Sequence, residues 1–123
     1  MTTLSASNES HDCLFCKITA KNIPAKIEYE DDDLVAIHDV NPQAPFHVLL
    51  IPKRHIVRIA DVEESDLALI GRMIYRAKKI AEVRNFSEPG YRLVFNSGAD
   101  GGQTVFHIHL HLLAGRHMTW PPG

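Results

Sequence analysis

The chain has 123 residues, which is enough for one domain with its own hydrophobic core and leaves little for a second. Its composition, 45% apolar and 23% charged, is ordinary for a soluble globular protein, and its formal net charge of −2 excludes a global basic field that would draw it to nucleic acid. No apolar run approaches the roughly 20 residues that a membrane-spanning helix needs.

A polar segment precedes the two cysteines. Residues 1–12 are rich in Ser, Thr and Asn, which predicts a flexible tail before a single domain over residues 13–123. This tail lacks a signal-peptide core, so the expected location is the cytoplasm, with nuclear access left open. Without a secretion signal, the Cys13-x-x-Cys16 pair indicates thiols or a metal site rather than a disulfide. A redox role is disfavoured because no long βαβ pattern surrounds the pair.

The first half of the domain predicts one short helix and three strands. Residues 14–20 can form the helix, which Asn22 and Pro24 would end. The strands are expected over residues 27–30, 34–38 and 48–51, with three aspartates in the turn between the first two. Residues 41–45 form a loop, because their two prolines lack the amide hydrogen that a sheet requires.

In the second half, the hydrophobic period changes from two to about 3.6 residues, which predicts one long helix from about Val62 to Arg84. Its apolar stripe consists of Ile70, Met73, Ile74, Ala77, Ile80 and Ala81. Acidic residues at its start and basic residues near its end suit the helix dipole and are expected on a solvated face. A strand is expected over residues 91–95, and residues 117–123 have no regular pattern. One long helix on an antiparallel sheet makes an α+β domain.

The segment 105–113 carries the strongest functional signal. Period two predicts a strand with Phe106, Ile108, Leu110 and Leu112 on one face and His107, His109 and His111 on the other. Successive histidine Cα atoms would lie about 6.6 Å apart, so the three imidazoles can hardly share one ion. At least one is therefore available for other chemistry. A tetrahedral metal site could instead combine Cys13 and Cys16 with two histidines.

A glycine-containing loop, residues 96–104, leads into this strand. Glycines let backbone N–H groups approach an anion, so the loop indicates a phosphate site, although a plain hairpin connection would have a similar composition. Asn96 and Thr104 add neutral donors at its ends. A neutral imidazole beside it can attack phosphorus and form a phosphoramidate intermediate.

The run His107-Ile108-His109-Leu110-His111-Leu112-Leu113 resembles the signature of the histidine triad (HIT) superfamily. Further similarities lie at residues 23–27, 38–39, 42–45, 51–53 and 101–103, and the ending Trp120-Pro121-Pro122-Gly123 resembles the Hint branch, the histidine triad nucleotide-binding proteins. This resemblance implies a two-layer HIT-like α+β fold that forms a homodimer with a continuous sheet. It implies no organic cofactor, while the net charge and the short apolar runs predict no nucleic acid partner and no membrane association.

The resemblance also implies a purine nucleoside phosphoramidase, which hydrolyses the P–N bond of adenosine or guanosine 5′-monophosphoramidates through a nucleotidylated histidine. His109 would be the nucleophile and His111 would contact the phosphate or the leaving group. His107 and His47 would support the histidine array from behind. The other implied nucleotide-binding residues are Phe15, Ile18, Asp39, Val40, Asn96, Gly102, Gln103 and Thr104. Trp120 would reach toward the site of the partner subunit.

Two features depart from the Hint pattern. Thr104 stands where serine is usual; it keeps the hydroxyl but adds a stiffening methyl group. The cysteine pair instead resembles the zinc-binding HIT proteins, which implies a structural zinc held by Cys13, Cys16, His55 and His107. Such a closed site leaves His109 and His111 free. Two alternatives stay open: a dinucleoside polyphosphate hydrolase, which the Trp-Pro-Pro-Gly ending disfavours, and a nucleotide-binding scaffold with incidental hydrolysis.

Overall fold

A computed structural model describes residues 13–123; the predicted tail, residues 1–12, lies outside the described residues. One sheet with the strand order β1-β2-β3-β5-β4 forms the centre, and every neighbouring pair of strands is antiparallel. The elements are α1 (Leu14–Thr19), β1 (Ile27–Glu30), β2 (Leu34–His38), β3 (Phe46–Pro52), η3 (Ile59–Asp61), η4 (Glu64–Asp66), α2 (Leu67–Val83), β4 (Tyr91–Phe95) and β5 (Leu110–Ala114). In residues 13–123, no helix has the length and apolarity needed to cross a membrane.

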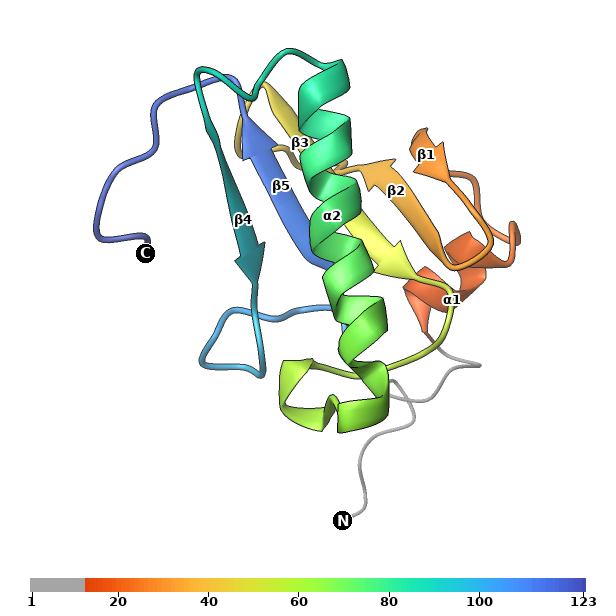
Figure 1. Cartoon of the computed structure of the whole chain (residues 1–123). Helices are drawn as coiled ribbons and strands as arrows, with labels where there is room; N and C mark the ends of the chain where they lie inside the picture. The colour runs from red at the N-terminus through yellow and green to blue at the C-terminus, as the bar shows by residue number, and fades with distance from the viewer. Residues whose placement is uncertain (1–12) are drawn as a thin grey trace.

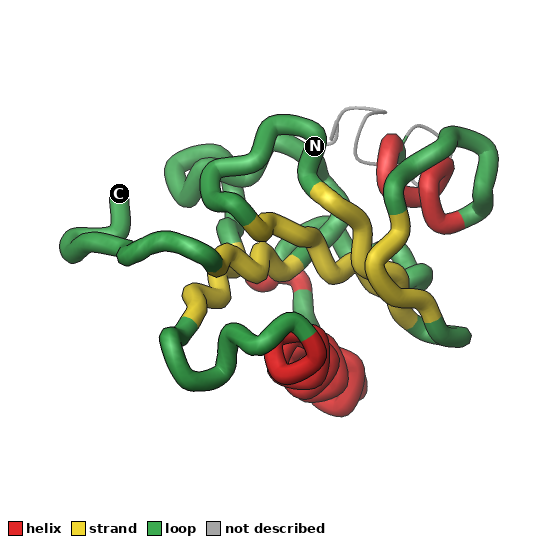
Figure 2. The backbone as a smooth tube through the Cα atoms, turned by 90° about the horizontal axis from the view of Figure 1, so that it is seen from above, coloured by secondary structure: helices red, strands yellow, loops and turns green. Residues whose placement is uncertain are grey.

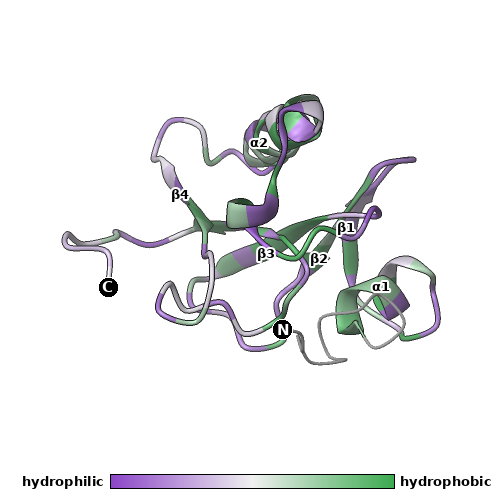
Figure 3. Ribbon diagram, turned by 90° about the horizontal axis from the view of Figure 1, so that it is seen from below, coloured by the Kyte–Doolittle hydropathy of each residue, from purple (hydrophilic) through white to green (hydrophobic). Residues whose placement is uncertain are grey.

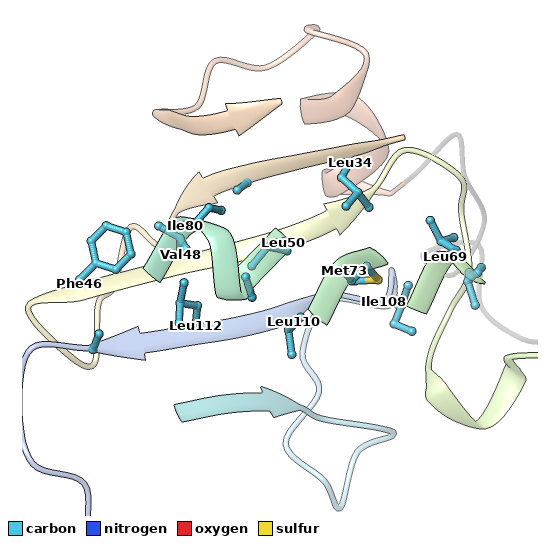
Figure 4. Close-up of a cluster of buried hydrophobic side chains, with 14 residues drawn as sticks. Leu34, Phe46, Val48, Leu50, Leu69, Met73, Ile80, Ile108, Leu110 and Leu112 are labelled. Atoms are coloured by element: carbon cyan, nitrogen blue, oxygen red, sulfur yellow. The ribbon is translucent and has the colours of Figure 1, made fainter. Parts of the chain in front are cut away.

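The two α-helices lie on opposite faces of the sheet (Figures 1 and 2). The long helix α2 covers one face, and the main core fills the space between α2 and the sheet (Figure 4). Leu50, Met73 and Leu112 are fully buried there. Burial of one such side chain contributes about 1.5–3 kcal/mol, so this interface stabilises much of the domain. The predicted α+β architecture is confirmed.

The short helix α1 covers the opposite face over a second core (Figure 3). Phe15 and Ile18 of α1 pack there against Val35 of β2 and Leu49 of β3. Strands β2 and β3 are therefore buried on both faces, which explains their continuous apolar runs. This second core places α1 beside the histidine-bearing face of β5.

The structure corrects the predicted helix in three respects. The regular helix α2 begins at Leu67, after two short 3-10 turns. Asp66, expected on a solvated face, is buried because its carboxylate accepts the backbone N–H of Glu63 at 2.9 Å and pairs with Arg54. Ile74, expected in the apolar stripe, is 45% exposed, and Leu69 packs in the core instead.

The predicted histidine strand is also shorter than expected. Strand β5 begins at Leu110, and its ladder with β3 ends where Leu50 pairs with Leu110. Beyond that point, the N–H of Ile108 donates to the carbonyl of Ile56 at 2.6 Å, so the chain after β3 takes the place of a strand partner. Ile108 still packs in the main core as predicted, whereas Phe106 is only partly buried and lies outside it.

Candidate functional site

The first histidine of the alternating run faces a cluster of sulfur and nitrogen atoms. His107 is fully buried, and its Nε2–H donates to the carbonyl of Pro52 at 2.7 Å. A neutral imidazole carries one hydrogen, so the lone pair of His107 lies on Nδ1. That atom is 3.2 Å from the Sγ of Cys13 and 3.4 Å from the Sγ of Cys16.

A fourth residue completes this cluster. The Nδ1 of His55 lies 3.2 Å from both the Sγ of Cys16 and the Nδ1 of His107. The four ligand atoms all fall within 4.8 Å of one another. In tetrahedral zinc sites, Zn–N near 2.0–2.1 Å and Zn–S near 2.3 Å separate neighbouring ligand atoms by roughly 3.3–3.8 Å. The four donors therefore have the chemistry and spacing of a closed zinc site.

The pKa shifts of Cys16 and His107 are consistent with a metal site. Burial, reinforced by the neighbouring Cys13 thiol, raises the pKa of Cys16 to about 12. Burial also lowers the pKa of His107 to about 4, although its bond to Pro52 opposes this shift. The cluster thus holds a neutral imidazole, and its thiols would ionise in the presence of a bound dication.

The other two histidines line a separate cavity of about 370 Å³ beside α1. Most of its wall is apolar, with polar groups from β5, the end of β2 and the glycine loop. A pocket of this size and character is typical of a small-molecule site. Of the predicted nucleotide-binding residues, it is lined by Phe15, Ile18, Asp39, Val40, Asn96, Gly102, Thr104, His109 and His111.

His109 presents a lone pair. Its Nδ1–H donates to the backbone carbonyl of His107 at 2.8 Å, which leaves Nε2 unprotonated in the neutral ring. The Phe15 ring and the imidazole pack in a T-shaped arrangement, with ring centroids 5.0 Å apart. Burial lowers the pKa of His109, while the His107 carbonyl and Asp39 raise it. The ring is therefore neutral at pH 7, the form in which it can act as a nucleophile.

His111 presents a hydrogen instead. The N–H of Gln43 donates to the Nδ1 of His47 at 3.1 Å, so the hydrogen of His47 is on Nε2. That Nε2 lies 2.9 Å from the Nδ1 of His111, which must accept. We therefore assign the hydrogen of His111 to Nε2. Burial lowers the pKa of His47 and lowers that of His111 to about 4, so both rings are neutral.

Strand register explains why these two rings meet. His47 pairs with Leu113 across the β3–β5 ladder, and His111 pairs with Leu49, so the two histidines are diagonal neighbours on one face. Asp39 follows β2 and is held beside β3, because its N–H donates to the carbonyl of His47 at 3.0 Å. Its Oδ2 lies 3.5 Å from the Nε2 of His47.

Gln103 differs from the other predicted binding residues. Its side chain is 4% exposed and does not line the cavity. The side-chain N–H groups donate to the carbonyls of Val57 and Val105, at 2.7 and 3.1 Å, and its oxygen accepts the N–H of Gly98 at 2.8 Å. Gln103 therefore braces the glycine loop from behind, and the loop offers Asn96, Gly102 and Thr104 to the cavity.

Two residues that contribute polar groups to the site were not selected from the sequence. His38 lines the cavity, and its Nε2 pairs with Glu28 at 2.9 Å, so it belongs to a network with Arg84. The sequence did offer one signal for His38, because it ends a predicted strand and directly precedes Asp39. Gln43 contributes through its backbone N–H, which no side-chain pattern reveals. Trp120, predicted to reach a partner, is 82% exposed in the single chain.

Comparison with known proteins places this geometry in a family. The HIT domain model matches residues 20–118. An uncharacterized HIT-like protein of Synechocystis is 49% identical over 114 residues, covering 93% of this chain and 99% of that protein. A 14 kDa zinc-binding protein of Brassica juncea is 45% identical over 114 residues, covering 91% of this chain and all of that protein.

Solved structures agree. The crystal structure of a HIT family hydrolase from Legionella pneumophila superposes with a TM-score of 0.89 and 56% identity, covering 90% of this chain and 99% of that one. The family match spans the whole sheet, including the histidine-bearing face of β5, and the glycine loop. This chain belongs to the HIT domain family.

Proposed function

We propose that the protein is a purine nucleoside phosphoramidase of the Hint branch. The observation that carries the proposal is the pair of neutral imidazoles in one cavity, with a lone pair on the Nε2 of His109 and a hydrogen on the Nε2 of His111. A nucleophile beside a neutral donor suits attack on phosphorus and stabilisation of the charged oxygens. The Legionella relative is described as a hydrolase, which supports this class of reaction.

The cavity wall suggests where each part of a nucleotide binds. Phe15, Ile18 and the fully exposed side chain of Val40 offer apolar surface for the base. The Asp39 carboxylate, whose Oδ1 is held by the N–H of Asn41 at 2.8 Å, is placed to accept hydrogen bonds from ribose hydroxyls. Asn96, Gly102 and Thr104 of the glycine loop would then surround the phosphate.

The reaction has two displacements. The Nε2 of His109 attacks phosphorus, the P–N bond to the amine breaks, and the leaving nitrogen keeps the electron pair and takes a proton from solvent. His111 donates its Nε2–H to the phosphoryl group. Water then attacks phosphorus, the bond to His109 breaks, a nucleoside monophosphate leaves, and the proton of water returns to solvent. His107 supports His109 through its carbonyl, and His47 orients His111.

We also propose that Cys13, Cys16, His55 and His107 hold a structural zinc. The four-donor geometry and the zinc-binding relative from Brassica support this assignment. A bound zinc would supply a fixed tether between α1 and the segment that precedes β5, and it would leave the chemistry to His109 and His111.

The test of the proposed reaction is direct detection of the intermediate. The protein is mixed with adenosine 5′-phosphoramidate, quenched in alkaline denaturant and analysed by peptide mass spectrometry. We expect an adenylyl group on His109 and release of AMP. His109→Asn should abolish both while retaining the fold, and His117→Asn, which alters an exposed histidine, should retain both. Turnover by His109→Asn at the wild-type rate would remove His109 from the reaction.

The same assay separates the alternatives. Faster turnover of a diadenosine polyphosphate than of the phosphoramidate would favour the polyphosphate hydrolase. Binding of AMP with neither turnover nor adduct would favour a nucleotide-binding scaffold.

A further inference from the structure

The turn after β5 is packed against the loop 41–45. Gly115 has φ +98°, and a Cβ at this position would lie 3.0 Å from the Cβ of Pro45. The adjacent Arg116 donates its Nε–H to the carbonyl of Gln43 at 2.9 Å. This loop lies outside the sheet, between β2 and β3, so these contacts hold it from the C-terminal side.

Gln43 is consequently held on both sides of its backbone. Its carbonyl accepts from Arg116, and its N–H donates to the Nδ1 of His47 at 3.1 Å. This N–H places the hydrogen of His47 on Nε2, where the Asp39 carboxylate 3.5 Å away also favours it. The Nε2–H then requires the Nδ1 of His111 to accept. A displaced loop would leave the Nδ1 of His47 without that donor and would permit the other tautomer of both rings.

We propose that Arg116 is a positioning residue: by holding Gln43, it fixes the tautomer of His47 and, through it, the tautomer of His111. The inference rests on the proposed function, in which the Nε2–H of His111 donates to the phosphoryl group. With the tautomer of His111 reversed, the Nε2 lone pair would face the phosphoryl oxygens and repel them. Arg116 is exposed and acts from outside the cavity, so it is not a catalytic residue.

The chain offers a matched control for Arg116. Arg92 is also an arginine on the C-terminal side of the domain, and its Nη2–H donates to the carbonyl of Thr119 at 2.8 Å. It therefore holds the same C-terminal segment to the domain through one bond to a backbone carbonyl. Its bond is to residue 119, beyond the turn that contacts the loop, so its loss leaves the bond to Gln43 in place.

The experiment reads the tautomers directly. Histidine-labelled ¹⁵N protein is studied by long-range ¹H–¹⁵N spectroscopy at neutral pH, where Nδ1 and Nε2 of a neutral ring give distinct shifts for each tautomer. In the wild type, we expect the Nε2–H tautomer at His47 and His111 and the Nδ1–H tautomer at His109. Arg116→Ala should give mixed tautomers at His47 and His111 only. Arg92→Ala should retain the wild-type spectrum.

Kinetics supply the second readout. The Nε2–H of His111 acts on the transition state, so kcat for the phosphoramidate should fall in Arg116→Ala, with a smaller change in KM. The expected fall is about 2- to 10-fold, which is the range for the loss of one neutral hydrogen bond. Arg116→Lys, which keeps a donor, should restore part of both readouts, and it provides a second variant if Arg116→Ala does not fold.

Two results would overturn the inference: wild-type tautomers in both Arg116 variants, or mixed tautomers in Arg116→Ala with unchanged kcat. Failure of the proposed function looks different, because the wild type would then show the expected tautomers but no turnover.

Discussion

Backbone groups place the hydrogens of three histidines in and behind the two sites. The carbonyl of Pro52 takes the Nε2–H of His107, and the carbonyl of His107 takes the Nδ1–H of His109. The N–H of Gln43 occupies the Nδ1 of His47. Burial lowers the pKa of all three rings, so each is neutral at pH 7 and its single hydrogen decides what it can do.

The metal cluster allows a prediction at the level of one side chain. Removal of one of four ligands opens a closed zinc site, so His55→Ala should reduce the zinc content of purified protein from about one per chain to near zero. His117→Ala removes an exposed imidazole away from the cluster and should retain the metal. Atomic absorption on both proteins, after dialysis against a weak chelator, gives the answer.

An equal zinc content in the two variants would show that His55 is not a ligand. A wild type that is free of zinc, with both thiols open to titration, would remove the site altogether.

Residue-level prediction succeeded where side chains carry the signal. The alternation of residues 106–112 placed the histidines and Ile108 on opposite faces. The distance between successive histidines on a strand indicated that the three cannot share one ion, and in the structure only His107 lies in the metal cluster. The same reasoning could not find Gln43 or the position of Gln103. A backbone N–H is common to all residues except proline, and the direction of an amide side chain depends on the fold of the whole loop.

At the scale of elements, α1 is shared by both sites. Cys13, its N-cap, and Cys16 contribute to the metal cluster, while Phe15 and Ile18 line the cavity. A helix of six residues is too short to be stable alone in water. Its position therefore depends on the second core and on whatever holds the two cysteines.

The two faces of β5 give a matched stability test. Leu112 is fully buried under α2, whereas its neighbour Leu113 points to the other face and is only half-buried. Leu112→Ala should lower the free energy of unfolding by about 2–5 kcal/mol, because it leaves a cavity in the main core. Leu113→Ala should cost clearly less. Urea unfolding followed by circular dichroism measures both, and equal losses would contradict the assigned faces.

Element boundaries were the weaker part of the prediction, for identifiable reasons. β5 begins late because its ladders with β3 and β4 both end at Leu110, and a pairing limit of this kind depends on distant segments. The helix begins late because Asp66 forms a capping interaction with Glu63 and an ion pair with Arg54 before α2 starts. The hydrophobic period of the sequence continues through these turns, so it does not reveal where the regular helix begins.

At the scale of the whole molecule, the two edges of the sheet differ. The edge strand β1 has the sequence Ile-Glu-Tyr-Glu, and its charges protect it from pairing with another chain. The opposite edge, β4, is Tyr-Arg-Leu-Val-Phe, and the C-terminal segment with the exposed Trp120 extends past it (Figure 1). An apolar edge strand beside an exposed aromatic side chain is typical of a surface that a partner covers.

One side of α2 continues this apolar edge. Arg76 lies over the Tyr29 ring of β1, and Arg72 pairs with Asp33 at 3.7 Å, so these arginines mark the side toward β1. At 100° per residue, Leu67 and Ile74 fall on the other side of the helix, toward β4. Leu67 is 61% exposed and Ile74 is 45% exposed. We propose that β4 and this side of α2 form the interface of a homodimer with a continuous sheet.

The dimer is tested by placing a charge on that side. Ile74→Lys puts an ammonium group in the proposed interface, and burial of an unpaired charge is unfavourable, so it should shift the mass in solution toward 13.8 kDa, the mass of one chain. Val83→Lys changes a side chain that is 78% exposed on the β1 side of the same helix and should leave the mass at twice that value. Sedimentation at several concentrations measures both. A wild type that sediments as a single chain throughout, or an Ile74→Lys protein as dimeric as Val83→Lys, would exclude this interface.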